Sequence, residues 1–142
     1  MPTVAVSSHG TLLKAGDGAG SEVFTTIAEV MDISGPGIAL GTEEVTSHDS
    51  AGWREFVATL KEIGEVTFDL NFNAGATQGF TAGIYLDLIN RTRRNFQLVI
   101  PTTSAKTGSF SAFVTSFEMD LPVEGVIRAS LTLQGTGALT WA

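Results

Sequence analysis

The sequence contains no cysteine, which excludes disulfide bonds and thiolate metal sites. Charged residues make up only 16 % of the 142 residues, whereas hydrophobic residues make up 43 %. Disordered chains have the opposite balance, so the composition favours a folded protein, and the length fits a single domain of residues 1–142. Basic residues are also scarce. The chain has 8 Lys and Arg residues against 15 Asp and Glu residues, so its formal net charge is -7. An acidic surface repels the phosphate backbone, which argues against a reader of nucleic acid.

Long hydrophobic runs and a targeting segment are missing as well. No stretch approaches the roughly 18 consecutive apolar residues of a membrane helix. The first ten residues, MPTVAVSSHG, have neither a basic start nor an apolar core, so we expect no signal peptide. The two histidines, His9 and His48, lie far apart, and the acidic residues do not have EF-hand spacing. We therefore expect no metal, no cofactor and no membrane association.

Alternating side chains predict a mainly β, antiparallel (α+β) protein. The clearest strand is Val66–Asn73, in which one face is apolar (Val66, Phe68, Leu70, Phe72) and the other polar (Thr67, Asp69, Asn71, Asn73). Further strands are expected at residues 11–15, 22–33, 96–100, 109–121, 126–134 and 138–141.

Two of these strand pairs are expected to be antiparallel hairpins. The glycine-rich segment 16–20 joins residues 11–15 to 22–33, and Pro122–Gly125 joins residues 109–121 to 126–134. In the second hairpin, one strand is expected to share an apolar face of Phe113, Phe117, Met119 and Leu121, and the other a face of Ile127, Ala129, Leu131 and Leu133.

One segment, Thr77–Asn90, has helical periodicity instead. Phe80, Ile84 and Leu88 are spaced by four residues and lie on one helical face. Thr77 can cap its start, and the cations of Arg91–Arg94 complement the dipole at its end. We expect one helix packed on the β structure. For residues 52–61 the pattern is compatible with either a helical turn or a short strand.

The stretch VTSHDSAGW places His48, Asp49 and Ser50 side by side, as if it were a hydrolase site. A catalytic triad needs these side chains on separate elements, with the imidazole between the other two. Adjacent residues in a loop point in different directions, and the sequence has no G-x-S-x-G elbow. A polar turn explains the stretch better, so we predict no catalytic residue and no enzyme activity.

Two other motifs also have simpler explanations. GDGAG, Gly16–Gly20, contains no lysine and precedes a strand rather than a helix, so it indicates a hairpin turn and not a phosphate loop. RTRR, Arg91–Arg94, is compatible with an anion site, a solvated helix end or a subunit contact. Because the rest of the chain is acidic, nucleic-acid binding there is disfavoured.

Four stretches in a fixed order resemble the major tail tube proteins of long-tailed, non-contractile (siphovirus-type) bacteriophages. They are ISGPGIALGTEEVTSHDS at 33–50, WREFVATLKEIGEVTFDLNFN at 53–73, the expected helix at 77–90, and FSAFVTSFEMDLPVEGVIRASLTLQGTGALTW at 110–141. The Gly-Pro turn and the strand after EIGE are the most specific features. Together the stretches cover most of the chain.

The resemblance implies a small β-sandwich or barrel with one flanking α-helix, at about residues 77–90, and a long loop after the second strand. Family members form homohexameric rings that stack into a hollow tube, and their inner strands join in one β-barrel around the lumen. The tube conducts genome DNA into the host. The long loop, which matches Gly41–Gly52 here, reaches the adjacent ring.

Site residues, partners and location follow from the same resemblance. The expected inter-ring contact loop comprises Gly41, Thr42, Glu43, Glu44, Val45, Thr46, Ser47, His48, Asp49 and Ser50, and the candidate lumen-facing residues are Thr67, Asp69 and Asn71. Expected partners are further copies of the chain, a tape-measure protein, a tail terminator and a tail-tip or baseplate initiator, while DNA passes without specific binding. The expected location is the virion tail, and the host cytoplasm during assembly.

Two alternatives remain open from the sequence. One is the tube protein of a type VI secretion system or contractile tail, which shares the fold. The other is a β-sandwich module that binds a ligand or decorates a capsid. Such a module needs an exposed aromatic platform, and the two tryptophans, Trp53 and Trp141, lie far apart in the sequence.

Overall fold

The computed structural model describes residues 5–18, 20–27, 30–72, 84–102 and 104–142. Seven strands form one antiparallel sheet in the order β2-β1-β7-β8-β9-β6-β3. Their bounds are β1 Leu12–Gly16, β2 Phe24–Thr26, β3 Val30–Ser34, β6 Glu65–Asn71, β7 Arg93–Ile100, β8 Lys106–Asp120 and β9 Arg128–Trp141. A second, two-stranded sheet consists of β4, Ile38–Glu44, and β5, Phe56–Ile63. The described helix is α1, Ile84–Asn90. The predicted mainly β, antiparallel fold is confirmed.

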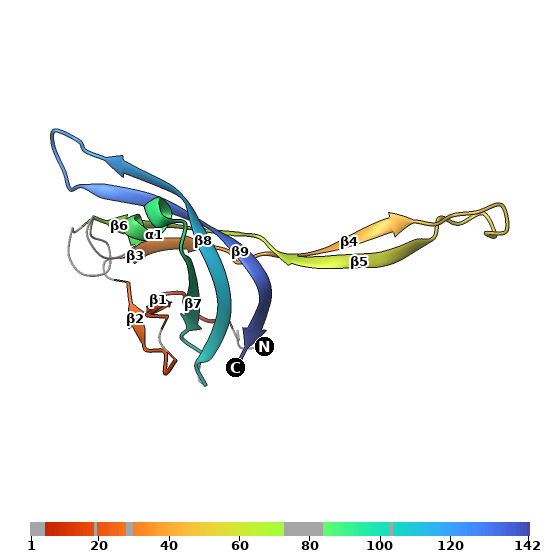
Figure 1. Ribbon diagram of the computed structural model, residues 1–142, viewed down its shortest axis with the longest axis horizontal. Coiled ribbons are helices and arrows are strands. Elements are labelled where there is room, and N and C mark those ends of the chain that lie inside the picture. The colour runs from red at the N-terminus through yellow and green to blue at the C-terminus, as the bar shows by residue number, and fades with distance from the viewer. Residues whose placement is uncertain (1–4, 19, 28–29, 73–83, 103) are drawn as a thin grey trace.

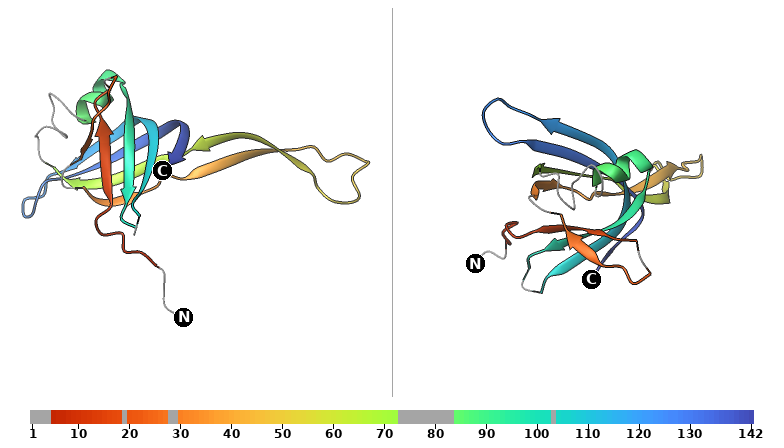
Figure 2. Two further views of the ribbon diagram at one scale, coloured as in Figure 1. Left: turned by 90° about the horizontal axis from the view of Figure 1, so that it is seen from below. Right: turned by 60° about the vertical axis from the view of Figure 1, so that its left-hand side comes forward.

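The large sheet is strongly curved (Figures 1 and 2). Its buried apolar side chains form one core cluster. Strand β6 shows why, because its side chains alternate as the sequence predicts and only the apolar set is buried. Helix α1 packs on the same core through Ile84, and Tyr85 meets the Phe117 ring of β8 edge-on at 5.3 Å. The buried core comprises Leu13, Ile27, Ile63, Val66, Phe68, Leu70, Ile84, Phe96, Leu98, Phe110, Ala112, Val114, Ala129, Leu131 and Leu133.

Both predicted hairpins are present. Strand β1 pairs with β2 across the glycine-rich segment, and β8 pairs with β9 across the turn at Pro122–Gly125. The segment 22–33 is divided into β2 and β3, which lie at opposite edges of the sheet. The two short strands expected at 126–134 and 138–141 are one strand, β9.

Of the apolar face predicted for β8, only Phe117 packs against the core, and the prediction is wrong at Phe113, Met119 and Leu121, which are exposed. The pairing of β8 with β9 shifts between Val114 and Ser116, so a β-bulge reverses which side chains face the core. Before the bulge the buried residues are Phe110, Ala112 and Val114, and Phe113 lies on the opposite, exposed face. On β9, Ala129, Leu131 and Leu133 are buried as predicted, whereas Ile127 precedes the strand and is exposed.

The predicted helix is confirmed over residues 84–90. Its expected first half, 77–83, lies outside the described residues, as does the proposed Thr77 cap. The helix has no basic residue in its last turn, and Arg91 follows it with a positive φ of 57°. The arginines of residues 91–94 therefore lie beyond the last turn of the helix.

Strands β4 and β5 and their connection, residues 38–63, form a hairpin that projects from the body (Figures 1 and 2). We call this segment the arm. The long loop expected at Gly41–Gly52 is wrong in part, because Gly41–Glu44 belong to β4 and only residues 45–55 connect the strands. Glycine and glutamate are poor strand formers, so the sequence did not predict a strand here. Cross-strand pairing with Phe56–Ala58 stabilises the strand in the structure. Of the segment 52–61, for which the sequence left a helical turn or a short strand open, residues 56–61 belong to strand β5 and residues 52–55 to the connection.

Candidate assembly surfaces

The arm joins the body through glycines. Gly35 has a φ of +96°, and a β-carbon there would lie 2.5 Å from the carbonyl oxygen of Glu65. The Gly64 N–H donates to the Gly37 carbonyl at 2.8 Å, which closes the two strands at the root of the arm. From this root onward β5 contacts the described body through β9, on which Ile63 packs.

Large hydrophobic side chains are exposed along the arm. Trp53 is 79 % exposed and Leu60 85 % exposed, far more than a monomer needs to leave in water. The set comprises Ile38, Leu40, Val45, Trp53, Phe56, Val57 and Leu60. A two-stranded hairpin is only marginally stable by itself, because neither face has a core to cover it. The arm therefore has the character of a surface that another molecule covers.

The tip of the arm is a hydrogen-bonded turn. The Val45 N–H donates to the Glu55 carbonyl at 2.8 Å, and the Glu55 N–H donates to Thr46 Oγ1 at 2.8 Å. The Ser50 hydroxyl donates to a Glu55 carboxylate oxygen at 3.0 Å and accepts the Ser47 N–H. Ser50 thus bonds to a glutamate rather than to His48, and the polar-turn interpretation of His48-Asp49-Ser50 is confirmed.

The predicted contact residues consequently divide between two elements. Gly41, Thr42, Glu43 and Glu44 lie on β4, and Val45, Thr46, Ser47, His48, Asp49 and Ser50 lie in the turn. The structure brings them together at the far half of the arm. The sequence analysis missed the apolar residues of β5 in the same half of the arm, Phe56, Val57 and Leu60, which the structure leaves exposed. The β-branched and aromatic residues of FVATL were the available signal for a strand.

The candidate lumen-facing residues share the polar face of β6. Thr67 is exposed, and Asp69 and Asn71 are half-buried. Ser130 of β9 donates its hydroxyl to Asp69 at 2.6 Å. A surface depression beside Asp69 collects three further acidic residues and one cation: Asp32, Glu118, Asp120 and Arg128. This side of the sheet is thus polar and predominantly acidic.

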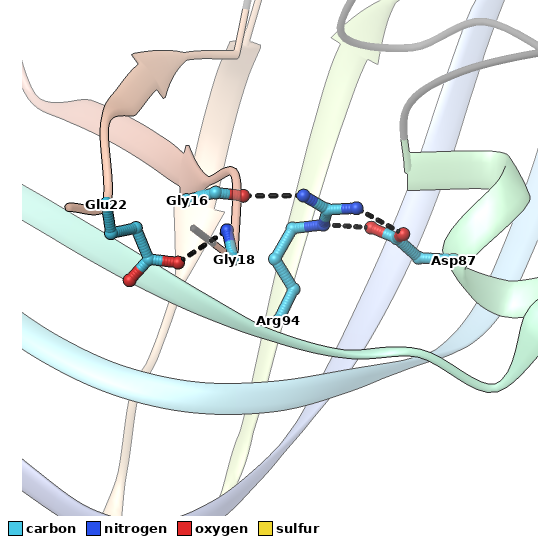
Figure 3. Close-up of polar contacts among 5 residues, drawn as sticks. All are labelled: Gly16, Gly18, Glu22, Asp87 and Arg94. Atoms are coloured by element: carbon cyan, nitrogen blue, oxygen red, sulfur yellow. Dashed lines mark hydrogen bonds and ion pairs between the residues drawn. The ribbon is translucent and has the colours of Figure 1, made fainter. Parts of the chain in front are cut away.

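Arg94 of the RTRR run forms a buried ion pair (Figure 3). Its Nε donates to Asp87 Oδ2 at 2.5 Å, its second terminal nitrogen to Asp87 Oδ1 at 2.6 Å, and its first to the Gly16 carbonyl at 2.5 Å. The hydrogen bond to Asp87 raises the pKa of Arg94, against the lowering effect of burial. One guanidinium therefore fastens α1 to β7 and to the end of β1. Each nitrogen of the Arg94 guanidinium donates a hydrogen bond within the fold, which disfavours an anion site at this residue.

Sequence reasoning missed this ion pair. The signal was available, since Asp87 lies three residues after Ile84 and one before Leu88, within the apolar stripe of the helix. A carboxylate in such a stripe needs a partner. Arg91 and Arg93 remain exposed.

The described part of the chain offers little else of chemical interest. Among the residues that the structure describes, no group of three His, Cys, Asp or Glu side chains is placed to hold a metal ion. Over the same residues, no helix has both the length and the apolar character needed to cross a bilayer.

Comparison with solved structures shows where else this fold occurs. The chain is similar to one from the tail of an empty GTA particle determined with C6 symmetry, with a TM-score of 0.75 and 24 % identity over 97 % of this chain and 99 % of that one. It is similar to the SPP1 tail tube, with a TM-score of 0.64 and 16 % identity over 92 % and 74 %. It is also similar to the sheath-tube complex of PVC, an extracellular contractile injection system, with a TM-score of 0.67 and 17 % identity over 98 % and 92 %.

At these identities the likeness establishes the fold, which contractile and non-contractile systems share. No curated protein matches the sequence. The family model for the lambda phage tail tube protein, TTP, matches residues 12–142, which is nearly the whole chain and includes the arm, the polar face and the ion pair. The chain therefore belongs to the lambda phage tail tube protein family.

Proposed function

We propose that this protein polymerises as stacked hexameric rings into the hollow tube of a phage tail, through which genome DNA leaves the virion. The family assignment makes it a structural protein of the virion tail. The proposal adds the ring number, the stacking contacts and the passage of DNA. It also treats residues 1–142 as one assembly unit with no catalytic step.

The exposed arm is the observation that carries the proposal. Its apolar side chains, Leu60 above all, are left exposed by the described part of the body, and a hairpin of this kind gains stability once a neighbour covers it. We propose that the far half of the arm, from Gly41 to Ser50 with the facing residues of β5, contacts the adjacent ring. The polar tip keeps the arm soluble before assembly.

The polar face of β6 suits the lumen in this proposal. Thr67, Asp69 and Asn71 point away from the core, and the neighbouring acidic residues give the face a negative charge. A negative wall repels the phosphate backbone, so DNA slides past without binding. The partners in this proposal are further copies of the chain, a tape-measure protein, a terminator and an initiator at the tail tip. A chain of the same fold occurs in the tube terminating cap of the anti-feeding prophage, which supports the terminator.

Imaging of the purified protein by negative-stain electron microscopy, over a range of concentrations, tests polymerisation directly. The informative variant replaces Leu60 by serine on the arm, and the matched control replaces Val123 by serine at the exposed tip of the β8–β9 hairpin. We expect six-fold rings and tubes from the wild type and from V123S. We expect L60S to fold with an unchanged circular dichroism spectrum but to assemble only at higher concentration.

Three results would contradict the proposal. The first is rings of another symmetry or fibres without a lumen. The second is a wild-type protein that stays monomeric both alone and with the tail-tip complex of the same particle. The third is equal assembly of L60S and V123S, which would refute the arm contact while leaving polymerisation intact.

A further inference from the structure

We propose that the contact between Ile63 and Gly135 fixes the direction in which the arm leaves the body, and thereby positions it for assembly. We call this contact the arm seat. The inference rests on the proposed role of the arm in contacting a neighbouring copy. It assigns a positioning function to two residues that lie far from the contact surface itself.

Ile63 is the point at which the arm is held. It is 4 % exposed, whereas the other seven residues of β5 are all exposed. Its side chain belongs to the core of the body, although its backbone is the last residue of the arm. Because one end of β5 is buried and the rest is free, the orientation of this side chain determines the line along which the strand departs.

Gly135 of β9 provides the space into which Ile63 fits. A β-carbon at residue 135 would lie 2.5 Å from Cγ2 and 2.9 Å from Cγ1 of Ile63. It would also lie 3.1 Å from the Gly64 carbonyl oxygen. Atoms cannot approach so closely, so any side chain at residue 135 would push the root of the arm away.

Hydrogen bonds hold the same point. The Gly135 N–H donates to the Gly64 carbonyl at 3.2 Å, and Gln134 Nε2 donates to the Ile63 carbonyl at 3.4 Å. On the other strand of the root, a β-carbon at Gly37 would meet no atom within 4 Å among the described residues, so close packing of this kind occurs at Ile63 and not at Gly37. We therefore assign the angle of the arm to the Ile63 side chain.

The length of the arm amplifies a small displacement at the seat. Relieving the contact of an added methyl group requires a movement of about 1 Å, which across a ribbon of about 5 Å strand spacing corresponds to a rotation of roughly 10°. Eight residues of extended strand span about 26 Å, so the tip would move by roughly 5 Å. A shift of that size takes an arm out of register with a rigid neighbouring surface.

The absence of cysteine makes this geometry measurable. Cysteines introduced at two exposed positions, Glu43→Cys on the arm and Lys106→Cys on β8, accept spin labels without interference from native thiols. Double electron–electron resonance then gives the distance distribution between arm and body. The measurement is made on the isolated subunit, below the concentration at which rings form.

Three variants are compared in this background. Gly135→Ala adds the clashing methyl group, and Gly135→Ala with Ile63→Ala removes the side chain that it meets. Gly20→Ala is the matched control, because a β-carbon at that glycine has no atom within 4 Å. We expect the mean distance to shift by several ångströms in G135A and to stay unchanged in G20A. In the double variant we expect the mean to return toward the wild-type value, with a broader distribution because the Ile63 side chain is missing.

Assembly follows the same order in the proposal. G135A loses tubes, the double variant regains them in part, and G20A assembles normally. An unchanged distance in folded G135A, or a double variant that does not restore it, would overturn the arm seat. If G135A does not fold, Ile63→Ala alone decides: a broadened distance distribution supports the seat and an unchanged one refutes it. A shifted distance with normal assembly would support the seat and refute the arm's role in the proposed function.

Discussion

Removing Arg94 tests whether the ion pair with Asp87 holds the helix on the sheet. The side chain of Asp87 is only 6 % exposed and that of Arg94 is 26 % exposed, so Arg94→Met leaves a carboxylate in the protein interior without its cation. Losing one partner of a buried pair costs about 3–5 kcal/mol. Because the arginine is partly open to water, we expect the lower end, about 3 kcal/mol, which in a domain of this size lowers Tm by roughly 6–12 °C.

Urea unfolding of the isolated subunit, followed by far-ultraviolet circular dichroism, measures this loss. Arg93→Met is the control, since that arginine is an exposed neighbour, and we expect it to change the free energy of unfolding by less than about 0.5 kcal/mol. The double variant D87L/R94M replaces the whole pair by apolar side chains and should be close to the wild type. A cost below about 1 kcal/mol for R94M, or a double variant no more stable than R94M, would refute the reasoning.

A pH titration cannot replace this experiment. The hydrogen bond to Asp87 raises the pKa of Arg94 above its ordinary value. A raised pKa means that the stabilisation is fully present below the unfolded-state pKa and is lost only as the pH rises through the folded-state pKa. That window lies beyond the pH at which the protein would be handled, so the arginine side of the pair stays charged throughout.

Three further predictions address the core, the arm root and the net charge. Phe68→Ala, at a side chain 2 % exposed, should cost about 3–5 kcal/mol in urea unfolding, whereas Phe113→Ala on the exposed face should cost about 1 kcal/mol or less. Gly35→Ala should destabilise the protein by about 1–3 kcal/mol, because its φ is +96° and the added carbon meets the Glu65 carbonyl; an unchanged midpoint would contradict this. Since each copy carries a charge of -7, light scattering should show faster assembly when added salt shortens the Debye length from about 30 to 10 Å; slower assembly would mean that attractive ion pairs dominate the interface.

Periodicity in the sequence predicts the body of this protein well. In β6 the alternation from Val66 to Asn71 is regular, and each apolar side chain is buried as expected. The turn at Pro122–Gly125 joins β8 and β9 as predicted. These features are local, because the residues that specify them are neighbours in the chain.

The sequence is less informative where distant strands decide the structure. The bulge after Val114 depends on the register with β9, so the reversed face of Phe113 could not be read from β8 alone. The strand at Gly41–Glu44 exists only because β5 pairs with it. The Asp87–Arg94 pair forms only because the helix and β7 are adjacent in the fold, and the spacing of the two residues in the sequence does not predict that adjacency. The contact and lumen assignments depend on neighbouring copies, and these stay predictions.

The position of β9 in the sheet has a consequence for when a subunit becomes able to assemble. It lies between β8, which carries β7, β1 and β2, and β6, which carries β3, so it is the strand that unites the two parts of the sheet. It also follows the other described strands in the chain, and the glycine on which Ile63 rests belongs to it. During translation the core stays open and the arm has no seat until β9 leaves the ribosome. If the arm makes the proposed contact with a neighbouring copy, a nascent chain exposes an arm that is not yet aimed, and assembly waits until β9 has paired.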